Sequence, residues 1–191
     1  MDGHPIHLNS PAQAVANHIA YVPPDRHRQG IIRQLSIRFN LTLAVVRRLC
    51  RRGFVRRQAE QALVDEYIEK LRIKCAGDAQ KVTFLSGGNQ QKVVIAKWLA
   101  TKHSLLILND PTRGVDVGAK AEIYALISEL ACAGMAIIIT SSEISEILGM
   151  SDRILVLNEG VVSREFLRGQ ADQKSLLSAA LVRADAPQGG L

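Results

Sequence analysis

A Ser-Gly-Gly turn and a short apolar run, separated by a helix-like stretch, constrain this chain more than any other feature. Residues 85–92 read Leu-Ser-Gly-Gly-Asn-Gln-Gln-Lys, and residues 105–112 read Leu-Leu-Ile-Leu-Asn-Asp-Pro-Thr. Glycine lets a backbone approach a phosphate closely, and the N–H groups and positive dipole of a helix N-terminus attract one. The apolar run predicts a buried strand that ends in an amide and a carboxylate. Together the two segments predict a phosphate-binding α/β domain.

From Leu85 onward, strand-like and helix-like segments alternate. We expect helices at 90–100, 123–130 and 144–148, strands at 105–108, 136–140 and 154–157, and a hairpin turn at 158–160. Upstream of Leu85 we expect strands at 6–8 and 19–22, a helix that starts at Asn9-Ser10-Pro11, and a polar loop at 25–30. Strands that alternate with helices of this length predict a largely parallel sheet.

The stretch from about Asn40 to Lys74 has a helical pattern of apolar residues, which predicts a small helical subdomain at about 36–84. Its apolar positions fall roughly on one face: Ala59, Leu63, Ile68 and Leu71. We interpret residues 1–168 as one incomplete nucleotide-binding domain. Residues 169–191 are expected to form a C-terminal helix, ending near Val182, and a flexible tail.

Cysteine spacing and hydropathy exclude several classes of protein. Cys50, Cys75 and Cys132 are far apart and odd in number, which argues against a disulfide framework and against a zinc site. No apolar run approaches the about 18 residues that a membrane-spanning helix needs. The N-terminus lacks the basic and apolar regions of a signal peptide.

The net charge of +6 is concentrated in one short stretch. Six arginines lie there: Arg47, Arg48, Arg51, Arg52, Arg56 and Arg57. They form either a solvated helix face or a contact surface for lipid head groups or acidic protein loops. We expect no nucleic-acid partner, because aromatic side chains do not alternate with the arginines as they do in single-strand binders.

Several segments resemble motifs of one group of ABC ATPases. Ala20–Arg26 resembles a segment with "VPEDR", 85–92 matches "LSGGNQQK", 110–120 matches "EPTRGVDVGAK" apart from its first residue, 141–144 resembles "SSEL", and 151–157 matches "ADRILVL". This set resembles bacterial importers of monosaccharides of the ribose, xylose and galactose type. It is most similar to the C-terminal half of their fused, two-domain ATP-binding subunit. The resemblance covers roughly residues 5–168 and implies a P-loop NTPase fold of the ABC type.

The resemblance also implies roles for individual residues. The residues that it places around nucleotide are Ser86, Gly87, Gly88, Asn89, Gln90, Asp116 and Pro24. Of these, Ser86, Gly87 and Gly88 would hold the γ-phosphate of an ATP that a second nucleotide-binding domain grips with its own phosphate loop. Asp116 would lie in a loop that crosses the dimer interface, and Pro24 occupies the position of a nucleotide-sensing residue that touches the membrane subunit. The catalytic positions would be Asp110 and Ser142, the latter in place of a switch histidine.

The departures from the family pattern weaken the nucleotide site that this domain's own strand would serve. No Gly-x-x-x-x-Gly-Lys-Ser/Thr occurs. In the family that loop precedes the segment where this chain begins, so we expect it to be absent rather than mutated. We also expect the sheet to have an unpaired edge beside 105–108, where the strand leading to that loop would lie.

Three single-residue departures from the family pattern are expected to weaken this nucleotide site further. Asn109 replaces the aspartate that would support Mg²⁺, and an amide carries no charge for the magnesium shell. Asp110 replaces a glutamate that orients attacking water, and its oxygens are drawn back by about 1.5 Å. A misplacement of about 1 Å can cost on the order of 100-fold in rate. Pro24 replaces a glutamate.

We therefore predict the ATP-binding, ATP-hydrolysing component of an ABC sugar importer, peripheral on the cytoplasmic face of the inner membrane. Its cofactors would be ATP and Mg²⁺. Its partners would be membrane permease subunits, a second nucleotide-binding domain and, indirectly, a periplasmic sugar-binding protein. The isolated chain is expected to be inactive. One alternative is a degenerate half-domain or broken-gene product that acts only as a binding module. Another is the tail of a DNA-repair or chromosome ATPase, which is disfavoured because no long heptad pattern occurs.

Overall fold

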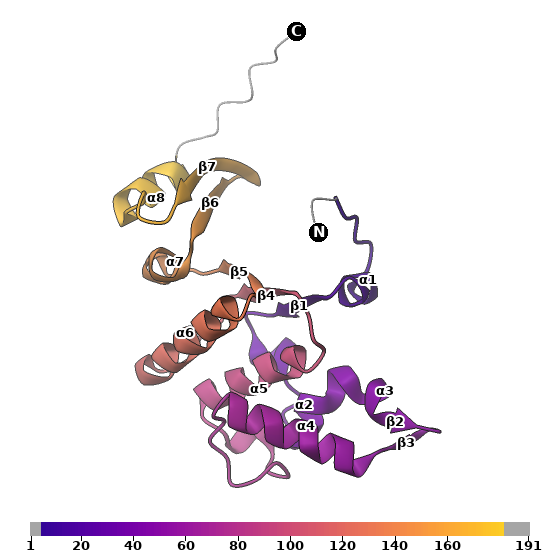
Figure 1. The fold of residues 1–191 in the computed structure, drawn as a ribbon. Coiled ribbons are helices and arrows are strands. Elements are labelled where there is room, and N and C mark those ends of the chain that lie inside the picture. The colour runs from indigo at the N-terminus through magenta and orange to yellow at the C-terminus, as the bar shows by residue number, and fades with distance from the viewer. Residues whose placement is uncertain (1–4, 182–191) are drawn as a thin grey trace. The chain divides into compact units, whose positions relative to one another are not determined.

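The computed structural model describes residues 5–181, which divide into two compact units at 138/139. The first unit holds a three-stranded sheet and a helical region, and the second holds a hairpin with two helices (Figure 1). No helix within residues 5–181 is both long enough and apolar enough to cross a membrane.

The sheet of the first unit is built from β1 (Ile19–Val22), β4 (Leu105–Asn109) and β5 (Ala136–Thr140), in the order β1-β4-β5. β1 and β4 are parallel, with Val22 opposite Leu108. This confirms the predicted parallel α/β core. The expectation of an unpaired edge beside 105–108 is wrong, because the apolar strand β5 occupies that flank of β4. In the described part of this sheet the outer strands are β1 and β5.

Several helices of this unit begin at a polar side chain that caps them. Among them, Ser10 caps α1 (Pro11–Ala16), Ser86 caps α5 (Gly87–Leu99), and Asp116 caps α6 (Val117–Cys132). Each cap accepts a hydrogen bond from a backbone N–H of the first turn, which otherwise has no partner within the helix. α5 is buried along most of its length and packs against β1 and α6. The helix predicted at 123–130 is confirmed as part of α6, and its buried face is formed by Ile123, Leu126, Ile127 and Leu130.

Helices make up most of the region predicted as a helical subdomain, but a short hairpin that was not predicted interrupts the stretch from Asn40 to Lys74. The region consists of α2 (Ile37–Thr42), η2 (Leu43–Val45), α3 (Val46–Leu49), the hairpin β2 (Cys50–Arg51) and β3 (Phe54–Val55), α4 (Arg57–Lys70) and η3 (Val82–Phe84). The chain turns at Arg52 and Gly53, which both have positive φ, 52° and 84°. Such a two-residue turn fits a tight antiparallel hairpin, and glycine adopts it at no steric cost.

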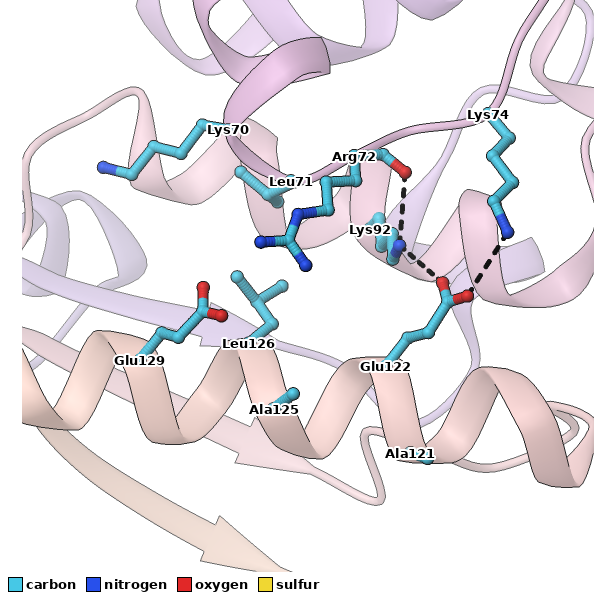
Figure 2. Close-up of a pocket in the computed structure, with 10 residues that line it drawn as sticks. All are labelled: Lys70, Leu71, Arg72, Lys74, Lys92, Ala121, Glu122, Ala125, Leu126 and Glu129. Atoms are coloured by element: carbon cyan, nitrogen blue, oxygen red, sulfur yellow. Dashed lines mark hydrogen bonds and ion pairs between the residues drawn. The ribbon is translucent and has the colours of Figure 1, made fainter.

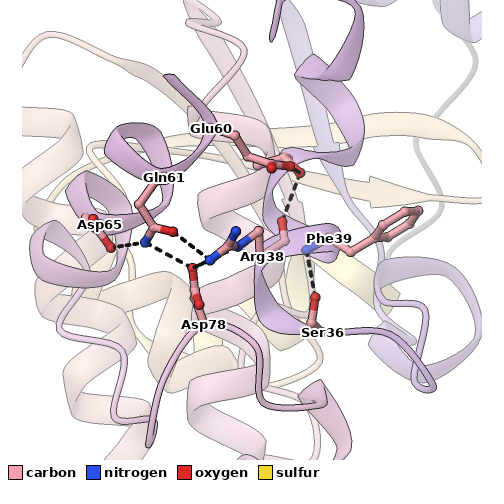
Figure 3. A network of polar contacts seen from close by, with 8 residues as sticks. Ser36, Arg38, Phe39, Glu60, Gln61, Asp65 and Asp78 are labelled. Atoms are coloured by element: carbon pink, nitrogen blue, oxygen red, sulfur yellow. Dashed lines mark hydrogen bonds and ion pairs between the residues drawn. The ribbon is translucent and has the colours of Figure 1, made fainter. Parts of the chain in front are cut away.

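A polar network joins the helices of this region to the loop that follows them (Figure 3). The Arg38 guanidinium donates to Asp78 Oδ2, with Nη2 at 2.6 Å and Nε at 2.9 Å. Nη2 also donates to Gln61 Oε1 at 2.6 Å. Gln61 Nε2 in turn donates to Asp65 and Asp78. The ion pair is half-buried, so α2, α4 and the loop before α5 are held together by more than apolar packing.

The second unit contains α7 (Ile144–Met150), β6 (Arg153–Asn158), β7 (Val161–Leu167) and α8 (Gln173–Leu181). β6 and β7 are antiparallel, which confirms the predicted hairpin turn. The core of this unit is made by Ile154, Phe166, Leu176 and Ala179. The predicted helix end at Val182 and the tail beyond it lie outside the described residues.

Two short upstream predictions differ from the structure. Residues 6–8 form no strand, and Ile6 and Leu8 are each 39% exposed, so the segment lacks the neighbouring strand that β structure requires. The polar loop at 25–30 instead winds into a single π-helical turn, η1 (Arg26–Gly30). Asp25 caps it, since its Oδ1 accepts from the N–H groups of His27 and Arg28. These bonds, chiefly that from Arg28, lower the pKa of Asp25.

Candidate functional site

The Ser-Gly-Gly segment, residues 86–88, forms the N-terminus of α5 and is called the signature turn below. Ser86 is exposed, and its Oγ accepts from Asn89 N at 3.5 Å and from Asn89 Nδ2 at 2.9 Å. Asn89 Oδ1 accepts from the backbone N–H of Lys74 at 2.8 Å. Both the nitrogen and the oxygen of the Asn89 side-chain amide are thus hydrogen-bonded, and these bonds fix the signature turn to the loop that follows α4.

Gln90 holds the signature turn through hydrogen bonds inside the protein. Its side chain is buried, and its Nε2 donates to the carbonyl oxygen of Leu85 at 3.0 Å. Its Oε1 accepts from Arg26 Nε at 3.4 Å. The sequence placed Gln90 among the nucleotide-binding residues, whereas the structure directs its amide into the protein.

Arg26 joins three segments that meet at the signature turn. From η1, its Nη1 donates to the carbonyl oxygen of Arg113 at 2.7 Å, and its Nη2 donates to that of Gly114 at 2.9 Å. The side chain is buried, and burial lowers its pKa. The fork of the guanidinium suits two neighbouring carbonyls, which a lysine could not bridge in the same way. Arg26 therefore fixes the loop after β4 against α5.

The glycines of the signature turn are required by packing inside this chain. A Cβ on Gly88 would lie 2.4 Å from the Cβ of Ala119 on α6. A Cβ on Gly87 would lie 2.9 Å from Nη2 of Arg26 and 3.2 Å from the carbonyl oxygen of Gly114. Both residues hence let α5 approach α6 and the loop after β4. No side chain of Gly87 or Gly88 itself stands between the start of α5 and an approaching phosphate.

Asp116 lies at the N-terminus of α6, next to this contact. Its Oδ1 accepts from the backbone N–H of Ala119 at 2.9 Å, so the carboxylate caps the helix. The residue is exposed, and the neighbouring Val117 is 85% exposed. The predicted interface loop is therefore held rigidly at its base by Asp116 while an apolar side chain stands in solvent.

The polar ends of β1 and β4 lie at one edge of the sheet, because the two strands are parallel and in register up to Val22 and Leu108. Pro24 follows β1 and is half-buried. Asn109 Nδ2 donates to the hydroxyl of Tyr21 at 3.2 Å. Asp110 has a φ of +45°, a conformation that Asp and Asn adopt more readily than most residues. The structure thus brings Pro24, Asn109 and Asp110 to the same end of the sheet.

The residues at the end of β4 offer few ligands for a magnesium ion. No group of three or more His, Cys, Asp and Glu side chains arranged to hold a metal occurs within residues 5–181. Asn109 and Asp110 offer one amide and one carboxylate, whereas Mg²⁺ in nucleotide sites is held by carboxylates together with the phosphates. This donor set fits a weakened site and not a complete one. Ser142 belongs to the second unit, where it is exposed in the loop between β5 and α7.

A hollow of about 480 Å³ opens elsewhere on the first unit, between the loop after α4 and the helices α5 and α6 (Figure 2). Lys92 Nζ lies 2.7 Å from Glu122 Oε2 and Lys74 Nζ lies 3.4 Å from Glu122 Oε1. The hydrogen bond from Lys92, its charge, and the same two contributions from Lys74 lower the pKa of Glu122. No predicted site residue lines this hollow. One of its ion pairs joins α5 to α6, and the other joins the loop after α4 to α6.

Two buried basic residues were missed as functional candidates on sequence alone. Arg26 lies inside the segment that resembles "VPEDR", and this resemblance could have indicated that Arg26 is a candidate functional residue. Lys97, at the other end of α5, donates from Nζ to the carbonyl oxygen of Gly30 at 2.6 Å, and burial lowers its pKa. A lysine in a helix normally predicts a solvated position, so no sequence signal marked this one.

Comparison with known proteins agrees with this geometry. The model of the family described as "ABC transporter" matches residues 1–113. The ribose import ATP-binding protein RbsA of Jannaschia sp. (strain CCS1) is 49% identical over 173 residues, which cover 91% of this chain and 34% of that protein. The xylose import ATP-binding protein XylG of Burkholderia cenocepacia (strain HI2424) is 48% identical over 181 residues, covering 95% and 35%. The chain spans about a third of the length of these relatives.

Solved structures share the fold at lower identity. A dimeric ATP-binding cassette, MJ0796, in a post-hydrolysis state with ADP and Pi, has a TM-score of 0.69 at 23% identity and covers 84% of this chain and 68% of its own. The ATP-binding cassette MJ1267 has a TM-score of 0.72 at 17% identity, covering 90% and 71%. These likenesses confirm the predicted ABC ATPase fold. With the family match over residues 1–113, they lead to one conclusion: this chain belongs to the ABC transporter family.

Proposed function

We propose that this chain is the ATP-binding component of a bacterial sugar importer and that it works through its signature turn. The turn is presented to an ATP whose phosphates a second nucleotide-binding domain holds in its own phosphate loop. Hydrolysis of that ATP, with Mg²⁺, drives sugar uptake through permease subunits. The chain would lie on the cytoplasmic face of the membrane, and a periplasmic sugar-binding protein would take part indirectly. The relatives named as ribose and xylose import ATP-binding proteins support this proposal.

The observation that carries the proposal is that the signature turn has an exposed serine and is held in place by contacts with other segments. Ser86 is exposed, although Asn89, Gln90 and Arg26 hold the turn from behind. α5 has 13 residues, so its N-terminus has a developed helix dipole, and the N–H groups of Gly87 and Gly88 have no acceptor within the helix. An exposed, rigid turn of this kind can stabilise charge on a phosphate without reorganisation.

The remaining site residues fit a dependent role. No phosphate-loop motif occurs in the 191 residues, and the end of β4 carries Asn109 and Asp110 in place of two stronger groups. We infer that the isolated chain binds ATP weakly and hydrolyses none above background. Asp116, Pro24 and Ser142 are proposed to contact nucleotide or partner only in the assembled transporter.

The test is sugar uptake by a reconstituted transporter that contains this chain and a partner domain with an intact phosphate loop. Ser86→Arg should abolish uptake, because the longer side chain fills the space of the γ-phosphate. Ser86→Ala removes the hydroxyl that caps α5 and accepts from Asn89 Nδ2, but it adds no bulk and leaves the glycine N–H groups in place, so it should lower uptake less than Ser86→Arg does. Ser128→Arg, at an exposed position on α6, is the matched control for adding an arginine. Uptake at the unmutated rate in Ser86→Arg would refute the trans role.

A second candidate function is a binding module without an ATPase role, and the pair Asn109 and Asp110 favours it. Under that reading, Ser86→Arg would leave the partner's ATP turnover unchanged. Loss of the chain would then change only assembly of the permease. Measuring ATP turnover and co-purification in the same variant separates the two candidates.

A further inference from the structure

The β2–β3 hairpin and the helix ends that flank it, residues 46–57, carry the whole excess of positive charge in this chain. Residues 46–57 contain six arginines and no acidic residue. Without these six, the sequence has as many basic as acidic side chains, 18 of each. All six arginines are exposed. A concentration of one sign on a twelve-residue segment therefore gives the first unit a single strongly cationic projection.

Local structure explains two of these arginines and leaves four without a role. Arg47 and Arg48 lie in the last turn of α3, where the helix dipole favours cations, and Arg48 Nη2 donates to the carbonyl oxygen of Ala100 at 2.8 Å. The other four are Arg51, Arg52, Arg56 and Arg57. Their side chains form no hydrogen bond or ion pair with any residue from 5 to 181.

Two of the four lie where they weaken the fold. Arg56 is the N-cap of α4 and Arg57 is its first residue. The cap makes no side-chain hydrogen bond, and the positive end of the helix dipole repels cations. Polar residues with oxygen side chains are strongly preferred at such a position. A residue choice that opposes local stability without compensation points to a function outside the fold.

An aromatic side chain stands among these arginines. Phe54, in β3, is 81% exposed, next to the turn formed by Arg52 and Gly53. The hairpin extends beyond the ends of α3 and α4, so its tip is clear of the helices of this unit (Figure 1). The hairpin base is fixed by the hydrogen bond from Arg56 N to the carbonyl oxygen of Leu49 at 3.0 Å. Phe54 is thus presented on an anchored hairpin and not on a loose loop.

We propose that the β2–β3 hairpin binds an anionic lipid bilayer, with Arg51, Arg52, Arg56 and Arg57 on the head groups and Phe54 in the interface. Cationic side chains around one exposed aromatic ring are the chemistry of peripheral membrane binding. A nucleic acid would also attract the charge, but a stacking platform for successive bases needs more than one aromatic ring. This proposal does not rest on the proposed ATPase role, since it requires no nucleotide.

The test is binding of the full chain to vesicles of phosphatidylcholine mixed with phosphatidylglycerol, and to phosphatidylcholine alone, without nucleotide. The chain should bind only the anionic vesicles, and salt should weaken binding. At about fivefold per basic residue, changing the four arginines to glutamine should weaken binding by at least about 100-fold. The control removes the same charge elsewhere, at exposed residues with no side-chain bond: Arg33→Gln, Lys81→Gln, Lys102→Gln and Lys174→Gln. It should retain most of the binding.

A matched aromatic pair tests the insertion step independently. Phe54→Ser should weaken vesicle binding by about tenfold, as expected for losing one partly buried aromatic ring. Phe84→Ser, at a residue that is 74% exposed outside the hairpin, should leave it unchanged. If circular dichroism shows that the fourfold arginine variant is unfolded, this pair decides the outcome. Equal binding to neutral and anionic vesicles overturns the proposal, as does equal loss in the two phenylalanine variants. Tighter binding to a single-stranded polynucleotide through the same arginines also overturns it.

Discussion

The signature turn and the end of β4 are the two regions of the first unit that the sequence motifs single out, and they differ in their residues and contacts. At the signature turn, Asn89 and Gln90 are each bonded to backbone groups of other segments, and Arg26 closes the assembly from behind. At the end of β4, Asn109 Nδ2 donates to the hydroxyl of Tyr21 at 3.2 Å, and Asp110 has a positive φ of 45°. The difference lies in residue chemistry. The signature turn keeps a serine and two glycines, whereas the end of β4 carries an amide and a short carboxylate, so our proposal gives the two regions different roles.

The largest expected effect comes from repairing the end of β4. In a protein that carries this domain together with a phosphate loop, Asn109→Asp with Asp110→Glu should raise turnover by at least about 100-fold. The pair should be more than additive, because each group is of little use without the other. Glutamate tolerates the positive φ at 110 less well, so the double variant should be slightly less stable. The assay is steady-state phosphate release from the single and double variants. Full turnover by the protein with Asn109 and Asp110 unchanged would show that Asn109 does not impair ATP hydrolysis.

The next effect tests whether Arg26 holds the two regions together. Arg26→Gln should destabilise the chain by about 2 kcal/mol, because the carbonyls of Arg113 and Gly114 lose charged donors. Arg26→Lys retains the charge and should recover less than half of the loss, since one ammonium cannot match the guanidinium fork. Urea unfolding of the three proteins is the measurement. Full recovery by lysine would mean that charge alone, and not geometry, holds the loop after β4.

A smaller effect separates packing from phosphate binding at the signature turn. Gly88→Ala should destabilise the chain by about 1–2 kcal/mol, because the new methyl meets the Cβ of Ala119. Gly118→Ala in α6 is the matched control. Its new Cβ would lie 3.6 Å from Asp116 Oδ1, which is ordinary contact, so it should be neutral or slightly stabilising. Equal stability of the two variants in urea would contradict the close contact between α5 and α6.

The smallest effect is a pH dependence at the far end of α5. Because burial lowers the pKa of Lys97 from 10.5, the unfolded chain binds more protons than the folded chain between that lowered pKa and 10.5. The contribution of Lys97 to stability should therefore rise with pH through this window, by less than about 1 kcal/mol. Lys97→Met should lack the rise. Comparing the two proteins isolates Lys97 from other groups that titrate at alkaline pH, and identical pH profiles would contradict the assignment.

The sequence predicted the parallel core well because its elements carry strong local signals. The apolar run of β4, the helix after the Ser-Gly-Gly turn and the helix at 123–130 can each be predicted from a short stretch of sequence. The hairpin at Arg52 and Gly53 was not predicted because each of its strands is two residues long. A strand that short cannot show the alternation of apolar and polar residues by which strands are predicted. Phe54 lies inside the arginine stretch, yet only its 81% exposure shows that it is available to a partner.

The candidate site could be predicted as a set of positions but not as a set of roles. Asn89, Gln90 and Gly88 were expected to face nucleotide because of where they stand in a motif. Their contacts involve segments 15 to 64 residues away along the chain, such as Lys74 and Arg26, which no local pattern contains. The flank of β4 was mispredicted for the same reason, since strand order is a property of the assembled sheet.

The central claim is that the signature turn meets the γ-phosphate of an ATP bound by another domain. A photoreactive ATP analogue with its label on the γ-phosphate tests this directly, with peptide mapping of this chain. We expect labelling at residues 86–92 only when a partner domain with an intact phosphate loop is present, and loss of labelling in Ser86→Arg. Equal labelling of residues 86–92 in the isolated chain, or none with the partner present, would contradict the account.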